Sequence, residues 1–431
     1  MELTHYLKTY PCPDKPGRVL LIATRRCAVL ELSESLLEKA RRGELAERER
    51  DTLVRLGVLV PDRGEERKEV RQTFTAINRA SRHFAALVTL TLECNLACGY
   101  CFEDPFRGRF VMADDTAGML VQRLTEQMAA GRDVTVDFYG GEALMALPLL
   151  KRIAGRLVEV AREAGVVFRF NIITNATLLT RRVVQELLPL GLAAVRVTLD
   201  GPREIHDQQR PFVSGKGSFD TIVANIKAIH ELVPVDLGGN YTRDNFQRFP
   251  EMLDLLIAEG IAPAALKAVG FSPVIPKADG SVSGDLGSAC ASTSEPWMIE
   301  ASLFLRHEVI RRGFPTPKLR AAACMVEFER DLVVAYDGSL YKCPAFMGRE
   351  ELRIGSLAEG IGAYAASHNL DVWKNDECLE CAYLPICFGG CRFLRLLRTG
   401  AIDGVDCRRV YLDTALEQLV RQDLAMGRPT A

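Results

Sequence analysis

Histidine and tryptophan are scarce in this sequence of 431 residues, with six and two copies, and the formal net charge is only −2. So small a charge gives no strong electrostatic field, and neither nucleic acid nor a membrane is expected as a partner. The sequence has no run of about 20 apolar residues that could span a bilayer. Its first residues also lack the apolar core of a secretory signal. These absences predict a cytoplasmic protein.

Composition and length predict a soluble protein with one large folded unit. Hydrophobic residues make up 48% of the chain and charged residues 26%, values typical of globular proteins. At about 150 residues per domain, the length allows two to four domains. Because a barrel of about 200 to 250 residues can form a single domain, we expect one such unit with smaller attachments.

Cysteine is the exception to this ordinary composition, with 13 copies. A chain of this length needs no disulfides to stabilise its core, and a reducing cytoplasm disfavours them. Clustered thiols in such a chain therefore indicate metal binding. Three cysteines form one tight cluster and seven lie in a C-terminal region, whereas three stand apart: Cys12, Cys27 and Cys290.

Residues 1–62 are expected to form a small α+β domain. Two apolar runs, Val19–Ala23 and Ala28–Leu32, are separated by four residues and predict a β-hairpin. Ser33 can cap a helix that ends at Gly43, and a second helix is expected over Glu47–Leu56. The highly charged residues 63–85 predict a solvated linker helix.

From residue 86 to about residue 275, apolar runs alternate with helical patterns. This βα alternation predicts a parallel sheet, either doubly wound or curled into a barrel, and periodicity alone does not separate the two. The six expected strands are Leu87–Leu92, Val134–Tyr139, Phe168–Ile173, Ala194–Leu199, Val233–Leu237 and Leu266–Phe271.

The tight cluster has the spacing C-x3-C-x2-C and directly follows the first strand, with Cys94, Cys98 and Cys101. Four-iron clusters normally take four thiolates, so three ligands would leave one iron open to another molecule. The alternatives are a zinc site with a distant fourth ligand, or three unrelated buried thiols. Zinc sites usually show paired C-x2-C knuckles, which this segment lacks.

A C-x3-C-x2-C motif directly after the first strand resembles the signature of the radical SAM superfamily. The resemblance implies a partial (β/α)6 barrel over residues 86–312 and S-adenosylmethionine (SAM) bound to the open iron. It also implies a 5′-deoxyadenosyl radical that abstracts hydrogen from the substrate.

Later strands end in residues that resemble other family motifs. Gly140-Gly141-Glu142 is similar to the motif that holds the methionine amino group. Thr174-Asn175 precedes Ala176, where relatives carry glycine. Thr198-Leu-Asp200-Gly-Pro, followed by Arg210, is similar to a segment near the ribose and carboxylate. The resemblance thus implies these SAM contacts: Tyr100, Gly140, Gly141, Glu142, Thr174, Asn175, Thr198, Asp200 and Arg210.

The C-terminal cysteines could describe a zinc ribbon, but zinc would use only four of the seven. Their complete spacing resembles the SPASM domain, expected over residues 313–431 with two auxiliary four-iron clusters. The resemblance gives one cluster the ligands Cys324, Cys343 and Cys391, and the other the ligands Cys378, Cys381, Cys387 and Cys407. The first set is one ligand short, so that cluster has an open iron unless Cys290 completes it.

The N-terminal hairpin and helices resemble a peptide-recognition element, which binds a leader peptide as an added strand. An unrelated cap on the barrel is the alternative. Taken together, the N-terminal segment and the barrel that follows it look most like the geopeptide radical SAM maturases. The resemblance implies a precursor peptide as substrate, an electron donor such as flavodoxin or ferredoxin, and three [4Fe-4S] clusters with SAM as cofactors.

The expected product is a peptide with intramolecular crosslinks, of which thioethers to cysteine are preferred. A carbon–carbon crosslink is one alternative. Another is a sulfatase-maturating enzyme that makes formylglycine, but such relatives carry Asp where this chain has Pro344. The third is a non-enzymatic iron–sulfur electron carrier, which would need neither the three-cysteine motif nor Gly140-Gly141-Glu142.

Overall fold

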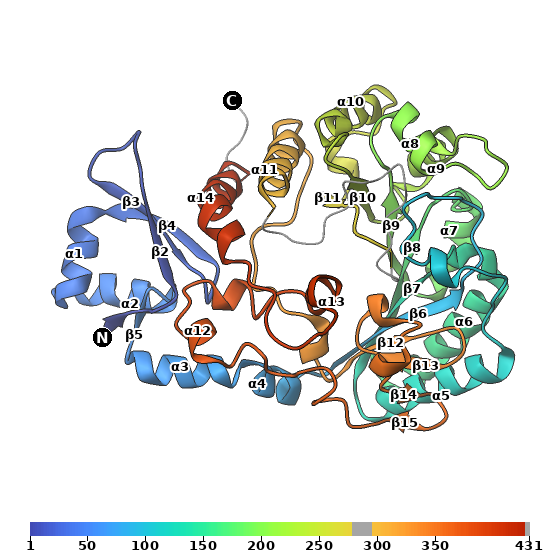
Figure 1. The fold of residues 1–431 in the computed structure, drawn as a ribbon, viewed down its shortest axis with the longest axis horizontal. Helices are drawn as coiled ribbons and strands as arrows, with labels where there is room; N and C mark the ends of the chain where they lie inside the picture. Colours follow the sequence, from blue (N-terminus) through green and yellow to red (C-terminus); the bar gives the residue numbers. More distant parts are fainter. Residues whose placement is uncertain (278–294, 427–431) are drawn as a thin grey trace. The chain divides into compact units, whose positions relative to one another are not determined.

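The computed structural model describes residues 1–277 and 295–426 (Figure 1). The chain forms two compact units, each built from separate stretches of sequence. The first unit comprises Met1–Ala80, Lys318–Phe328 and Asn369–Ala431, and the second comprises Ser81–Pro317 and Glu329–His368. We call them the terminal unit and the barrel unit.

The barrel unit contains six parallel strands that are neighbours in chain order. A doubly wound sheet would reverse its strand order at a switch point. Unbroken chain order with right-handed crossovers instead brings the helices to one face and favours a barrel. The expected partial barrel is therefore confirmed. Its strands are β6 (His83–Thr91), β7 (Asp133–Gly140), β8 (Phe168–Thr174), β9 (Leu192–Thr198), β10 (Val235–Tyr241) and β11 (Ala268–Pro273).

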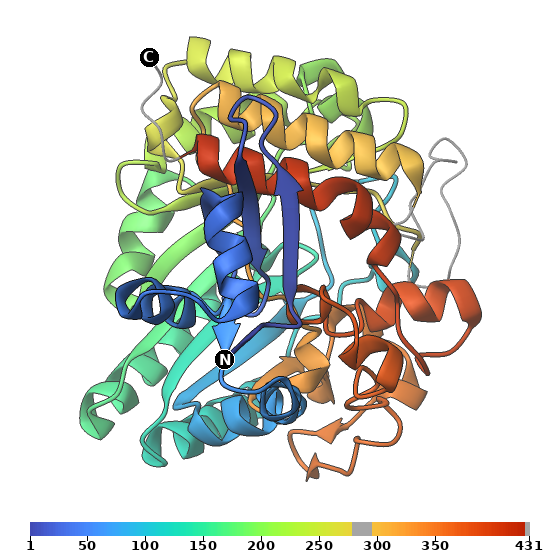
Figure 2. The same cartoon turned by 90° about the vertical axis from the view of Figure 1, so that its left-hand side faces the viewer.

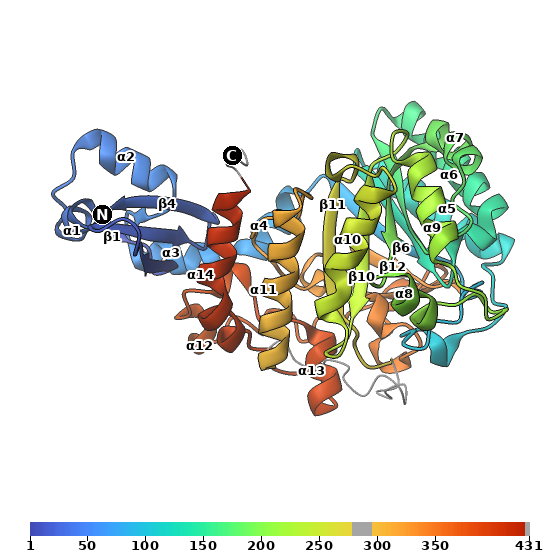
Figure 3. The ribbon, with the colours of Figure 1, turned by 90° about the horizontal axis from the view of Figure 1, so that it is seen from above.

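Helices between the strands cover the outer face of this sheet (Figures 1 and 3). Their apolar faces and the strands bury one continuous hydrophobic core. The boundaries follow the expected pattern closely, but a short helix at Arg203–Gln209 was not expected. The helices are α5 (Asp114–Ala129), α6 (Leu147–Ala164), α7 (Arg181–Leu187), α8 (Arg203–Gln209), α9 (Phe219–Ile229), α10 (Phe249–Ala258) and α11 (Pro296–Arg311).

Four further strands extend the barrel sheet beyond β6. β12 (Asp331–Val334) pairs with β6 in parallel, and Asp331 lies opposite Ala85. The antiparallel strands β13 (Ser339–Tyr341), β14 (Gly355–Ser356) and β15 (Gly360–Ile361) follow. This pairing joins residues 329–368 to the barrel unit, so the division into units differs from the expected boundary at residue 312.

The terminal unit begins with two small antiparallel sheets. β1 (Glu2–Leu3) pairs with β5 (Leu59–Val60), and the other sheet has the order β2-β3-β4. Its strands are β2 (Leu7–Pro11), β3 (Arg18–Ala23) and β4 (Ala28–Ser33), followed by α1 (Glu34–Arg42) and α2 (Glu47–Arg55). The predicted cap is present, because Ser33 Oγ accepts a hydrogen bond from Leu36 N at 3.1 Å. Gly43 ends α1 with φ at 74°.

The charged stretch after β5 forms two helices and is not wholly solvated, in contrast to the prediction. α3 (Arg63–Arg71) and α4 (Thr73–Ala80) bury one face. Glu66 is 2% exposed and accepts a hydrogen bond from Thr4 Oγ1 at 2.5 Å. Val70 and Phe74 pack with Trp373 in a local core. Val70 lies near the end of α3 and Phe74 near the start of α4, so both helices contribute to this core despite the surrounding charges.

The C-terminal part of this unit contributes α12 (Asp376–Leu379), α13 (Arg392–Thr399) and α14 (Arg409–Ala425). α14 lies beside the β2-β3-β4 sheet (Figure 2). Arg421 donates a hydrogen bond to the Pro11 carbonyl at 2.7 Å, and Lys8 forms an ion pair with Asp413 at 3.8 Å. The β2 edge is therefore covered. Among the described residues, no strand pairs with the outer edge of β4, and no helix is long and apolar enough to cross a bilayer.

Candidate functional site

The three-cysteine motif forms a loop at the carboxyl end of β6. Leu96 N donates a weak hydrogen bond to Cys94 Sγ at 3.5 Å. Burial raises the pKa of all three thiols, that of Cys101 to about 12, and the charge of Cys98 raises the pKa of its two neighbours further. Thiolates crowded in this way need a compensating positive charge, which bound iron supplies. The donor set thus fits an iron–sulfur cluster.

Gly140 and Gly141 hold the cysteine loop against β7. A Cβ at Gly140 would collide with the Thr91 carbonyl oxygen, and one at Gly141 would collide with that of Glu93. Gly141 N and Glu142 N donate hydrogen bonds to these same two carbonyls, at 3.0 and 2.8 Å. The glycine pair is therefore explained by close backbone contact with the residues that lead into Cys94.

Glu142 is a buried acceptor that links three segments. Its carboxylate accepts hydrogen bonds from Leu144 N at 2.9 Å, Asn175 N at 2.8 Å and the Thr174 hydroxyl at 2.8 Å. Burial raises its pKa, whereas these hydrogen bonds oppose the rise. Its predicted contact with the methionine amino group stays a prediction.

Asn175 joins the end of β8 to the cysteine loop. Its Nδ2 donates to Asn95 Oδ1 at 2.8 Å and lies 3.8 Å from Cys94 Sγ. Ala176, which replaces a family glycine, has φ at 62° and so keeps the left-handed conformation that glycine adopts easily. Ala176 thus adopts a backbone conformation that is uncommon for a residue with a side chain.

A second polar network lies at the ends of β9 and β10. The Tyr100 hydroxyl donates to Asp200 at 2.5 Å and accepts from Arg210 at 2.6 Å. Asn240, which the sequence reasoning missed, donates to Tyr100 at 2.9 Å. The buried Arg210 Nε has no partner among the described residues, so a guanidinium donor is available to a ligand carboxylate. Thr198 is the last residue of β9.

His206 supports this network from α8. It is fully buried, its Nδ1 accepts a hydrogen bond from Asp200 N at 3.1 Å, and its Nε2 lies 3.0 Å from Ser218 Oγ. Burial and the Arg210 charge lower its pKa to about 2. His206 is therefore neutral at physiological pH and holds the loop that carries Asp200.

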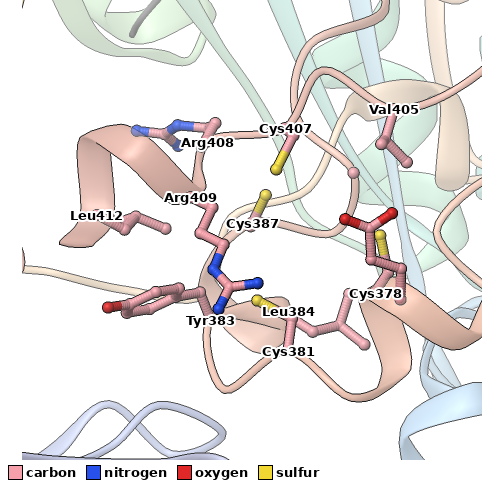
Figure 4. A pocket seen from close by; sticks show the side chains of 12 residues that line it. Cys378, Cys381, Tyr383, Leu384, Cys387, Val405, Cys407, Arg408, Arg409 and Leu412 are labelled. Atoms are coloured by element: carbon pink, nitrogen blue, oxygen red, sulfur yellow. The ribbon is translucent and has the colours of Figure 1, made fainter.

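Four cysteines of the terminal unit line one pocket (Figure 4). Burial raises the pKa of Cys378 to about 11, and the charges of the other three thiols add to this rise. Burial also raises the pKa of Cys381 and of Cys387, and the charge of Arg409 opposes the rise at Cys381 and that of Arg408 the rise at Cys387. No three His, Cys, Asp or Glu side chains in the described ranges are placed to hold a single metal ion. The cysteines of the pocket are Cys378, Cys381, Cys387 and Cys407.

Two of the other predicted cluster ligands also meet in the terminal unit. Cys324 lies close enough to Cys391 to raise its pKa. Cys343 belongs to the barrel unit, and Cys290 lies outside the described residues. Next to Cys391, the buried Arg392 forms an ion pair with Glu327 at 2.7 Å, which sequence reasoning did not detect.

Glu103 and Tyr139 form a second pair that sequence reasoning missed. The Tyr139 hydroxyl is hydrogen-bonded to the Glu103 carboxyl, and the charges of Cys101 and Cys343 both reach Tyr139. Glu103 is 4% exposed, and burial raises its pKa to about 7 against the opposing charge of Arg107. Glu103 and Tyr139 become neighbours only because the fold brings β7 against the cysteine loop, so the sequence alone does not indicate this pair.

Comparisons with known proteins agree with this geometry. Residues 88–256 match the model of the radical SAM superfamily. The chain is 31% identical over 176 residues to Fe-coproporphyrin III synthase of Methanosarcina barkeri, a match that spans 40% of each chain. It is 24% identical to PqqA peptide cyclase of Rhodopseudomonas palustris, over 72% of this chain and 81% of that one. A cysteine-type anaerobic sulfatase-maturating enzyme of Clostridium novyi is also 24% identical, over 70% of this chain and 85% of that enzyme.

Two solved structures show the same fold. AnSMEcpe, bound to AdoMet and the Kp18Cys peptide, has a TM-score of 0.61 at 18% identity and covers 80% of this chain and 99% of its own. Streptococcus suis SuiB, bound to the precursor peptide SuiA, has a TM-score of 0.51 at 14% identity. The match covers 95% of this chain and 99% of the SuiB chain. Residues 88–256 therefore form a radical SAM domain, a family match that implies a four-iron cluster and SAM.

Proposed function

We propose that this enzyme matures a ribosomally synthesised peptide by installing intramolecular crosslinks. The observation that carries the chemistry is the meeting of the Cys94, Cys98 and Cys101 loop with two buried polar networks at one edge of the barrel. A peptide substrate is supported by relatives such as PqqA peptide cyclase. The fold likeness to peptide-bound SuiB also extends over 95% of the chain.

In this proposal, Cys94, Cys98 and Cys101 bind the radical SAM cluster, and SAM supplies the 5′-deoxyadenosyl radical that removes hydrogen from a substrate carbon. The chain's own residues hold and orient SAM. Arg210 pairs with the methionine carboxylate through its free Nε. Glu142 and Asn175 fix the loop that carries Cys94.

We further propose two auxiliary clusters with the predicted cysteine ligands. The pocket shared by Cys378, Cys381, Cys387 and Cys407 supports one of them. For the other, Cys324 and Cys391 lie close together, and the neighbouring Arg392 has a buried Nε and Nη1 without partners among the described residues. A guanidinium in that place suits an anionic cluster.

The leader of the precursor is proposed to bind at the outer edge of β4. An open strand edge recognises an extended peptide through backbone hydrogen bonds, and α14 covers the β2 edge of the same sheet. Hydrogen–deuterium exchange tests this assignment. Addition of precursor should slow exchange in residues 28–33 and leave residues 7–11 unchanged. Equal protection of both strands, or of neither, would refute the assignment.

The preferred crosslink is a thioether between a substrate cysteine and a carbon of the same peptide. Each bond would form as the 5′-deoxyadenosyl radical takes one hydrogen atom from the substrate carbon and becomes 5′-deoxyadenosine. The thiol would lose its proton, and an oxidised iron–sulfur cluster would accept the remaining electron. Pro344, at the position where sulfatase-maturating relatives carry Asp, agrees with a reaction that needs no such base. A carbon–carbon crosslink and formylglycine formation are the alternatives.

Anaerobic coexpression with a candidate precursor peptide that contains cysteine tests the function, with mass spectrometry as the measurement. A thioether should remove two hydrogens and protect one cysteine from alkylation per crosslink. A peptide that loses two hydrogens but keeps every cysteine alkylatable would instead indicate a carbon–carbon bond. A purified enzyme that forms no 5′-deoxyadenosine from SAM would contradict the proposal as a whole.

A further inference from the structure

A cavity of about 440 Å³ lies in the barrel unit beside the cysteine loop. Its walls come from the segment after β6 and from the β12–β13 hairpin with the residues that follow it. Phe110 stacks on Tyr336 at 5.2 Å between ring centroids, and Met347 adds a further apolar surface. This volume falls in the range of about 300 to 1,000 Å³ that is typical of ligand sites.

The cavity contains one buried polar atom without a partner. Of its charged side chains, Arg107 donates a hydrogen bond to the Leu96 carbonyl, and the exposed Asp337 accepts one from Ser339 N at 2.9 Å. Glu103 is bound to Tyr139 on one side, but its buried Oε1 has no hydrogen-bond partner among the described residues. A buried acceptor without a hydrogen-bond partner is unfavourable, so the arrangement calls for a donor from a ligand.

The proposed SAM contacts lie elsewhere. Apart from Tyr100 in the cysteine loop, they lie at or after the ends of β7, β8 and β9, and none of them lines this cavity, whose walls come from residues next to β6, β12 and β13. Tyr139 links Glu103 of the cavity to the cysteine loop, because it is hydrogen-bonded to Glu103 and lies within reach of the charges of Cys101 and Cys343. A molecule in the cavity would therefore lie close to the cluster loop without competing for the SAM contacts.

We propose that this cavity binds the reacting segment of the precursor peptide and that Glu103 Oε1 accepts a hydrogen bond from it. The donor is a neutral group flanked by apolar atoms: a thiol, a hydroxyl or a backbone N–H. The aromatic and Met347 surfaces hold the neighbouring apolar atoms. This inference rests on the proposed function and names the substrate subsite of the same enzyme.

The test uses the full chain with its clusters and the cysteine-containing precursor peptide that it modifies in coexpression. Glu103→Leu keeps the side-chain volume and removes the acceptor, whereas Glu103→Gln keeps an acceptor oxygen and can donate its amide to Tyr139. Glu163→Ala, an exposed residue near the end of α6, is the surface control. For each protein, kcat, KM for the peptide, crosslinks formed per 5′-deoxyadenosine and iron content are measured.

We expect Glu103→Leu to raise KM at least tenfold, with a smaller change in kcat, and to lower crosslinks per 5′-deoxyadenosine at least tenfold. Glu103→Gln should stay within threefold of the wild type in KM, and Glu163→Ala should match the wild type. Peptides with the reacting cysteine replaced by alanine or by serine separate a thiol or hydroxyl donor from a backbone donor. With a backbone donor, both peptides bind the wild type as tightly as the parent peptide.

Two results would overturn the inference while the proposed function stands. One is a Glu103→Leu enzyme whose KM and crosslink ratio remain within twofold of the wild type. The other is loss of iron in Glu103→Leu, which would assign Glu103 to the support of the cluster. A wild-type enzyme that cleaves SAM but never modifies the peptide would refute the proposed function and the inference together.

Discussion

Gly141 shows how a residue without a side chain supports the chemistry of its neighbours. Its backbone contacts the carbonyl of Glu93, one residue before Cys94, and leaves no room for a Cβ. Gly141→Ala should therefore displace the cysteine loop, lower the iron content by one cluster and abolish formation of 5′-deoxyadenosine. Iron analysis and chromatography of the SAM products measure both effects.

Gly118→Ala is the matched control for this change. Gly118 lies within α5, and a Cβ there meets nothing within 4 Å. Because glycine destabilises a helix interior by about 0.5 to 1 kcal/mol relative to alanine, this variant should keep full iron content and gain slightly in stability. Equal iron loss in both variants would contradict the role given to Gly141.

His206 makes the stability of the barrel unit depend on pH. Its pKa is 6.5 when unperturbed and about 2 in the folded protein, so below pH 6.5 the unfolded chain binds a proton that the folded chain does not. The free energy of unfolding should fall by up to about 1.4 kcal/mol per pH unit below that point. His206→Asn should flatten this dependence between pH 6.5 and 4.5 in anaerobic thermal unfolding. If the free energy of unfolding of the variant depends on pH as steeply as that of the wild type, this role of His206 is wrong.

The sequence identifies the cysteines and the strand-end motifs because each is a local pattern with fixed spacing. Residues such as Glu103, Tyr139 and Asn240 gain their roles only from neighbours brought close by the sheet. Tyr139 is 36 residues from Glu103 in the sequence, and no spacing rule connects them. The buried pair of Glu327 and Arg392 was missed for the same reason.

At the scale of elements, that buried pair joins the segment after Cys324 to the start of α13. Both side chains are almost fully buried, at 1% and 2% exposure. Removal of one partner leaves an uncompensated buried charge, so Arg392→Ala should lower the free energy of unfolding by about 3 to 5 kcal/mol. Anaerobic urea unfolding measures this loss.

An exposed ion pair in the same unit provides the comparison for Arg392. Arg41 pairs with Glu38 at 3.3 Å on the surface of α1, and such pairs contribute about 0 to 1 kcal/mol. Arg41→Ala should therefore change stability far less than Arg392→Ala. The double variant Glu327→Leu with Arg392→Leu should recover part of the loss, since it leaves no charge buried.

The periodicity of the sequence predicts the six barrel strands well because each is a buried apolar run. It does not predict β2, whose segment Leu7–Pro11 contains lysine, threonine and proline. Nor does it predict β12 as a neighbour of β6, since that pairing joins positions 246 residues apart, such as Ala85 and Asp331. Strand pairing across such a distance depends on the whole sheet rather than on the strand itself.

At the scale of the whole molecule, the cysteine groups predict three four-iron clusters in the anaerobically purified protein. Replacement of Cys94, Cys98 and Cys101 by alanine should remove one cluster and abolish SAM cleavage, and the other two should remain. Iron and sulfide analysis with Mössbauer spectroscopy counts the clusters. Continued production of 5′-deoxyadenosine by the triple variant would overturn the assignment of the radical SAM cluster.

The terminal unit is built from both ends of the chain. Tyr6 donates a hydrogen bond to the Leu379 carbonyl, and Phe74 packs against Trp373. During synthesis, the first 80 residues leave the ribosome before these partners exist. At about 5 to 20 residues per second, they wait roughly 15 to 60 seconds with an unfinished core. Residues 1–80 can therefore make these contacts only after the segment that carries Trp373 and Leu379 has been synthesised.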